Sequence, residues 1–153
     1  MKKILLAFLI LQFYHSATAQ FVARLEIKDT DTIQGLCDRK NVYTLFPMFK
    51  GQQEAECSEL KDDIQERLNT EVTYLKTNPG KNDKGMISII INCKGEVVRC
   101  ETDNKTKNEE LDKQILAVFK TLKTWKPGKL NGTEVDSVSL WSFEIKKGKI
   151  VLT

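Results

Sequence analysis

Apolar and polar positions in the second half of the chain predict a β-hairpin followed by an amphipathic helix. Residues 86–93 are rich in β-branched side chains and predict a mostly buried strand. Lys94-Gly95 predicts a turn, and residues 97–102 predict the returning strand. Thr106 and Glu109 predict a capping box at the start of the helix. The apolar stripe of this helix consists of Leu111, Ile115, Val118, Phe119 and Leu122.

The chain after this helix predicts two turns and a long strand. Trp125-Lys126-Pro127-Gly128 ends the helix, because its proline cannot continue a helix and its glycine permits a left-handed turn. Asn131-Gly132 predicts a second turn, and residues 150–152 predict a short terminal strand. The long strand is expected at residues 135–145, and its apolar positions are Val138, Leu140, Trp141, Phe143 and Ile145.

The first half of the chain is less regular but predicts one more helix. Leu60, Ile64 and Leu68 recur on one face of a helical pattern at residues 53–68. Residues 22–27 predict a short strand before it. The expected order is therefore (β)αββαβ(β), an α+β fold with two helices packed on one face of a small antiparallel sheet.

The N-terminus has the pattern of a secretory signal peptide. Lys2 and Lys3 precede an apolar run at residues 4–11, and Ala17 and Ala19 occupy the two small-residue positions of a cleavage site. The run is shorter than the roughly 17 to 25 residues of a membrane-spanning helix. We therefore expect cleavage after Ala19, with retention as a membrane anchor as the alternative. The expected division is a signal peptide at 1–19, an N-terminal extended segment at 20–50 and a domain at 51–153.

Cleavage would also change the chemistry that the chain has available. The formal charge would fall from +3 to +1, because Lys2 and Lys3 leave with the leader. This balance does not favour nucleic acid or an anionic membrane surface as a partner. The only histidine, His15, would leave as well, so a catalytic triad, a Cys–His pair and a histidine zinc ligand are excluded. We expect no enzymatic activity, no cofactor and no bound metal.

Four cysteines would remain: Cys37, Cys57, Cys93 and Cys100. An even number in an exported domain predicts a disulfide framework, and four cysteines allow three pairings. A bond between Cys93 and Cys100 is disfavoured, because the predicted hairpin places Cys100 opposite Ile89. We favour a pairing of each hairpin cysteine with one of the two N-terminal cysteines. The alternative is a reactive Cys57 thiolate, stabilised at the start of the first predicted helix.

The last long strand carries apolar side chains on both of its faces. Trp141 and Phe143 lie on one face, where the alternative to partner binding is that they cover the core, and Val138 and Leu140 lie on the other. The N-terminal segment covers the second face in the preferred interpretation, and a partner protein covers it in the alternative. Trp125 is expected to fill the core beneath the second predicted helix rather than to hold a ligand.

Several motifs occur in a defined order across about 60 residues of the second half. The hairpin around Lys94-Gly95 is followed by the turn at residues 125–128, by the Gly-x-x-Val segment at 132–135 and by Phe143-Glu144-Ile145. This order resembles the C-terminal domain of TonB and of TonB-like energy transducers. The Tyr-Pro-x-x-Ala segment that usually precedes the hairpin in that family is absent, and so is a Pro-rich spacer.

The resemblance implies a non-enzymatic module that binds a partner by β-augmentation at the exposed edge of the last long strand. The implied partner is an outer-membrane transporter or another envelope protein, in the periplasm or at the surface of a Gram-negative-type bacterium. The alternatives are a stand-alone structural or adhesive envelope protein and a small secreted inhibitor. For binding at the last long strand, the expected partner-binding residues are Val138, Leu140, Trp141 and Phe143.

Overall fold

A computed structural model describes residues 21–26 and 33–153 of the chain, so the expected leader and its cleavage site lie outside the described residues. The described part is an α+β fold with three helices and eleven strands. The helices are α2 (Lys61–Glu71), α3 (Tyr74–Thr77) and α4 (Glu109–Phe119). The strands are β1 (Ala23–Glu26), β2 (Asn41–Thr44), β3 (Gln52–Gln53), β4 (Glu56–Cys57), β5 (Asp83–Ile91), β6 (Val97–Asn104), β7 (Trp125–Lys126), β8 (Gly128–Leu130), β9 (Thr133–Val135), β10 (Ser137–Lys146) and β11 (Lys149–Leu152).

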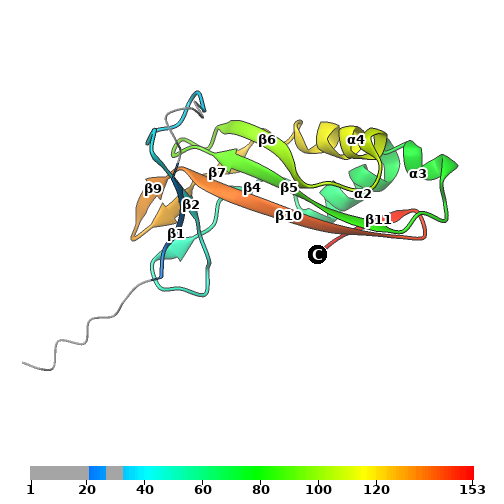
Figure 1. The fold of residues 1–153 in the computed structure, drawn as a ribbon. Coiled ribbons are helices and arrows are strands. Elements are labelled where there is room, and N and C mark those ends of the chain that lie inside the picture. The colour runs from blue at the N-terminus through cyan, green and yellow to red at the C-terminus, as the bar shows by residue number, and fades with distance from the viewer. Residues whose placement is uncertain (1–20, 27–32) are drawn as a thin grey trace, which may run out of the picture.

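The principal sheet is built around β10, the long orange strand in Figure 1. Its strand order is β1-β2-β10-β5-β6, and β11 pairs with β10 as well. β10 and β5 are antiparallel neighbours over nine residue pairs, from Ser137 opposite Ile91 to Ile145 opposite Asp83. β2 pairs with β10 in the parallel direction. The expectation of a purely antiparallel sheet is therefore wrong, because the long connection between β2 and β10 allows the two strands to run the same way.

Two helices and the sheet enclose the main hydrophobic core. Ile64 and Leu68 of α2, and Ile115 and Phe119 of α4, are fully buried. They belong to the same cluster as the buried residues of β5, β10 and β11, so both helices cover one face of the sheet. The core residues contributed by these strands are Ile87, Ile89, Ile91, Phe143, Ile145, Ile150 and Leu152.

The N-terminal segment covers part of the opposite face. Ile33 and Val42 are buried with Ile90 of β5 in a second, smaller cluster. Val138 packs against this cluster, as expected for one of the apolar residues on the second face of β10. Leu140 lies two residues further along the strand and remains 49% exposed. The N-terminal segment therefore covers the beginning of the second face and leaves its middle open.

The first expected helix is shorter than predicted, because α2 begins at Lys61 and not at residue 53. Residues 52–53 and 56–57 form β3 and β4 instead, which pair with β8 and β7. The connection is also held by Ser58, whose N–H donates to the carbonyl oxygen of Thr124 over 2.9 Å. These partners lie about 70 residues away in the sequence, so the local helical pattern could not reveal them.

The capping box expected at Thr106 is also wrong. The N-cap of α4 is Asn108, whose Oδ1 accepts a hydrogen bond from the N–H of Leu111 over 2.8 Å. The N–H of Thr106 donates to the Asp112 carboxylate instead, over 3.0 Å. Asparagine is among the preferred N-cap residues, so the helix begins two residues later without loss of a cap.

The Trp125–Gly128 segment is extended rather than a left-handed turn. Trp125 is buried in the core, as expected, and its Nε1 donates to the carbonyl oxygen of Leu122 over 3.0 Å. Gly128 does not have a positive φ. It is a glycine for a different reason: an added Cβ would lie 2.6 Å from Cδ1 of Leu45 and 2.6 Å from Oγ of Ser137. Close packing, not turn geometry, requires this glycine.

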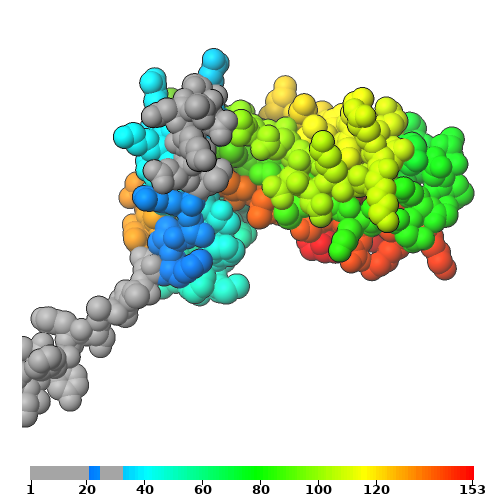
Figure 2. Space-filling model, in the orientation of Figure 1, coloured from blue at the N-terminus to red at the C-terminus, as the bar shows by residue number. Residues whose placement is uncertain are grey.

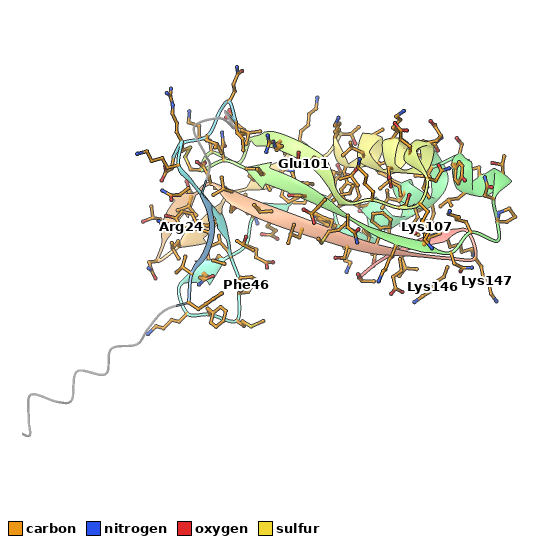
Figure 3. All side chains as sticks on the ribbon, in the orientation of Figure 1. Arg24, Phe46, Glu101, Lys107, Lys146 and Lys147 are labelled. Carbon is orange, nitrogen blue, oxygen red and sulfur yellow. A yellow bond between two sulfur atoms is a disulfide. The ribbon has the colours of Figure 1, made fainter. Side chains whose placement is uncertain are left out.

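The molecule is elongated, with the N-terminal strands at one end of β10 and the helices at the other (Figure 1). In Figure 2, blue and cyan residues lie at the first end, and the red C-terminal residues lie along the lower border of the second. Phe46, labelled in Figure 3, belongs to a cluster of three rings at the first end, with Phe21 and Phe49. No helix in the described ranges combines the length and apolar character needed to cross a membrane.

Candidate strand-binding groove

The outer edge of β10, on the side away from β5, is covered at both ends. β2 pairs with Ser137 and Val138, and β11 pairs with residues 143–146. The exposed edge that we expected on this strand is therefore restricted to its middle. Within the described residues, no strand pairs with positions 139–142 on this side. Figure 1 shows this interval in the middle of β10, between β2 and the C-terminus.

The backbone of Leu140 presents its polar groups to this open interval. The N–H of Tyr43 donates to the carbonyl oxygen of Asp136 over 2.9 Å, and the N–H of Thr153 donates to that of Ser142 over 3.0 Å. Both acceptors therefore face the outer side of β10. Successive residues of a strand alternate in direction, so the N–H and carbonyl oxygen of Leu140 face the same side. These are the groups to which an added strand would bond.

A groove of about 380 Å³ lies beside Leu140. It is lined by residues 54–57 and 59–61, by residues 139–141 and by Thr153. Its volume is at the lower end of the range of roughly 300 to 1,000 Å³ that is typical of ligand sites. Two large apolar side chains are exposed at the groove, Leu60 at 69% and Leu140 at 49%. The groove thus combines an unpaired strand edge with apolar contact surface.

The structure separates the four residues predicted to bind a partner. Leu140 and Trp141 line the groove, whereas Phe143 is only 2% exposed and belongs to the main core. Val138 packs in the second cluster. Trp141 is half-buried against Phe119, with ring centroids 5.7 Å apart. Only the middle pair of the predicted set therefore remains available for binding.

Leu60 and Glu54 line the groove but were missed from the sequence. Leu60 fits the apolar face of the expected first helix, so the helical pattern assigned it to the core. It is instead the N-cap residue of α2 and is mostly exposed. The local pattern does not show the later start of α2, which removes Leu60 from the buried face.

The groove wall carries three glutamates, two of which already have cationic partners. Glu56 pairs with Lys126 over 2.9 Å, and Glu59 pairs with Arg67 over 2.9 Å. Glu54 makes no ion pair within the ranges that the structure describes. Glu54 is exposed, and partial desolvation beside the groove raises its pKa because it disfavours the charged form. A cation brought into the groove would relieve this cost.

The four cysteines form one disulfide, between Cys37 and Cys93, with a Cα–Cα distance of 6.0 Å. This bond joins an N-terminal cysteine to a hairpin cysteine, as we favoured. Cys57 and Cys100 are free, so the expected second disulfide is absent from the structure. Cys100 lies opposite Ile89, as the predicted hairpin register requires.

The free thiols do not have the character of catalytic nucleophiles. Cys57 lies in β4, not at a helix N-terminus, and burial raises its pKa. Burial raises the pKa of Cys100 to about 11. Reactive cysteines have lowered pKa values, whereas the pKa values of both of these thiols are raised.

A buried carboxylate lies beside the disulfide. Asp136 is 1% exposed, and its Oδ1 and Oδ2 accept hydrogen bonds from the N–H groups of Cys93 and Asp38, over 2.8 and 2.7 Å. A carboxylate oxygen of Asp136 and the sulfurs of Cys37 and Cys93 lie within 4.8 Å of one another. Thiolates, not disulfide sulfurs, bind zinc. Asp136 and the disulfide therefore hold the N-terminal segment to the hairpin. The two cysteines could act as metal ligands only after the disulfide is reduced.

Comparisons with protein-family models, with curated proteins and with solved structures gave no match to this chain. Any assignment of function therefore depends on the geometry of the chain itself.

Proposed function

We propose that this chain is an exported, non-enzymatic TonB-like module, which binds an extended segment of an envelope protein by strand addition at β10. The open interval beside Leu140 carries the proposal, because it leaves backbone hydrogen-bonding groups facing a groove. The succession α2, β5, β6, α4 and β10, which α3 and the short strands β7 to β9 interrupt, supports the proposal. The Cys37–Cys93 disulfide is compatible with an exported protein.

The interval also limits what the partner can be. It spans residues 139–142 and is bounded by β2 and by Thr153. Paired strands have nearly the same rise, about 3.3 Å per residue, so a partner strand that fills this interval would pair over only three or four residues. Side-chain contacts with Leu60, Leu140 and Trp141 would have to supply much of the remaining affinity. An outer-membrane transporter with a short extended segment fits these limits.

The proposal can be tested by replacing the one N–H that an added strand requires. Leu140→Pro removes this N–H, whereas the ladder to β5 uses the alternate residues and is retained. Leu140→Thr keeps the N–H and shortens the side chain, so it is the matched control. The probe is a displayed library of random linear peptides, each about 12 residues long and able to cross the groove as a strand.

We expect the wild-type chain to enrich peptides that bind it. Their affinity should fall by about tenfold or more with Leu140→Pro, because a backbone hydrogen bond is lost and the ring obstructs the edge. The loss should be smaller with Leu140→Thr, and bound peptide should protect the Leu140 amide from hydrogen exchange. Equal binding to the Pro variant and the wild type would overturn strand addition. Absence of any enrichment would favour the structural or adhesive alternative, and capture of a protease from envelope extract would favour the inhibitor.

A further inference from the structure

We infer that the partner segment carries a basic side chain that pairs with Glu54 when the strand is added beside Leu140. This inference rests on the proposed function, because it assigns a chemical preference to the same groove. The open strand edge defines where the partner backbone lies, and the acidic residues that line the same groove define the charge that its side chains meet.

The charges of the groove wall favour a cation at one position. Glu54, Glu56 and Glu59 line the groove, and Lys61 is the only basic residue among its lining residues. Glu56 and Glu59 are neutralised by Lys126 and Arg67, which approach from outside the groove. Of these three glutamates, Glu54 is the one that forms no ion pair with a residue in the described ranges. An acidic partner side chain would meet like charge there, and a neutral side chain that covers Glu54 would remove water from the carboxylate without pairing it.

Strand geometry makes this pairing selective for one residue of the partner. Alternate residues of an added strand point to the same side, so only every second side chain can face a given wall. Leu60 and Leu140 offer apolar surface at the same groove. The partner segment is thus expected to combine one lysine or arginine with apolar neighbours.

The peptide library provides the test, with Glu54→Gln as the variant and Glu101→Gln as the matched control. Glu101 is an exposed glutamate on β6, which β5 separates from β10 (Figure 3). Both substitutions remove one surface carboxylate charge. Peptides selected on the wild-type chain should be enriched in lysine or arginine at one position. Their affinity should fall by about two- to fivefold with Glu54→Gln, and should be unchanged with Glu101→Gln.

The outcomes separate the two proposals. Enriched peptides that lack a basic preference, or that bind the Glu54→Gln variant as tightly as the wild type, would overturn the charge preference and leave strand addition intact. Equal losses with both variants would show a general effect of net charge and would also overturn it. Failure to select any peptide sensitive to Leu140→Pro would remove the proposed function itself. Addition of salt should weaken the wild-type complex more than the Glu54→Gln complex.

Discussion

The disulfide between Cys37 and Cys93 is expected to supply a large share of the stability of the chain. It closes a loop across a sequence separation of 56 residues. The chain-entropy relation gives about 4 kcal/mol for a loop of this length at 25 °C. Single domains are stable by roughly 5 to 15 kcal/mol, so the crosslink accounts for a substantial part of the total.

The double variant Cys37→Ser/Cys93→Ser isolates this contribution. Asp136 accepts its two hydrogen bonds from backbone N–H groups, which serine substitution leaves in place. Equilibrium unfolding in guanidinium chloride, followed by circular dichroism, should show a loss of about 4 kcal/mol. The m-value should rise, because an unfolded chain without the crosslink exposes more surface.

The matched control is Cys57→Ala/Cys100→Ala, which removes the two free thiols and retains the crosslink. Intact-mass measurement should show that this control, like the wild type, gains about 2 Da on reduction, as expected for one disulfide. A gain of about 4 Da by the wild type would mean that two disulfides form. A loss of less than about 1 kcal/mol in the Cys37→Ser/Cys93→Ser variant would refute the entropic argument for this loop.

Three further measurements address the fold. Gly95→Ala should destabilise the chain by at least about 2 kcal/mol in chemical unfolding, because φ is +81° and the added Cβ would lie 2.3 Å from the carbonyl oxygen of Trp125; a neutral effect would contradict this packing. Burial raises the pKa of Cys100 from 9.0 to about 11, so between these pH values the thiol ionises only in the unfolded chain. The free energy of unfolding of the wild type should therefore fall by roughly 2 to 3 kcal/mol relative to that of Cys100→Ala between pH 9 and 11. Parallel pH profiles of the two proteins would refute this. Burial raises the pKa of Asp83, but hydrogen bonds from backbone N–H groups and from a lysine outweigh it and lower the pKa below 3.8. The stability that this carboxylate contributes should therefore be lost as the pH falls below about 3.8, and Asp83→Asn should show less of this acid dependence.

The elements that depend on local patterns could be predicted from the sequence. The β5–β6 hairpin follows from a run of β-branched residues and a Lys-Gly turn, and Cys100 lies opposite Ile89 as its register requires. The stripe of α4, including Leu111, Ile115 and Phe119, is buried as its helical spacing predicts. These features depend on residues within about ten positions of one another, so the chain itself contains the signal.

The candidate site could be predicted only in part, for the same reason. Leu140 and Trp141 were assigned to the site because the TonB-like resemblance points to the last long strand. The exposure of Leu60 at the groove depends on where α2 begins. Its start is set by the pairing of β4 with β7, a contact between distant parts of the chain.

The sequence by itself determined the α+β class, the central hairpin, the amphipathic helix α4 and the buried position of Trp125. Hydrophobic periodicity carries this information, because a helix or strand must present its apolar face to a core wherever that core lies. Only the tertiary structure decided that Cys37 bonds with Cys93, that β2 runs parallel to β10, and that the edge of β10 is open only beside Leu140. Each of these depends on which distant segments meet, and strand pairing and disulfide formation have no local pattern that specifies their partner.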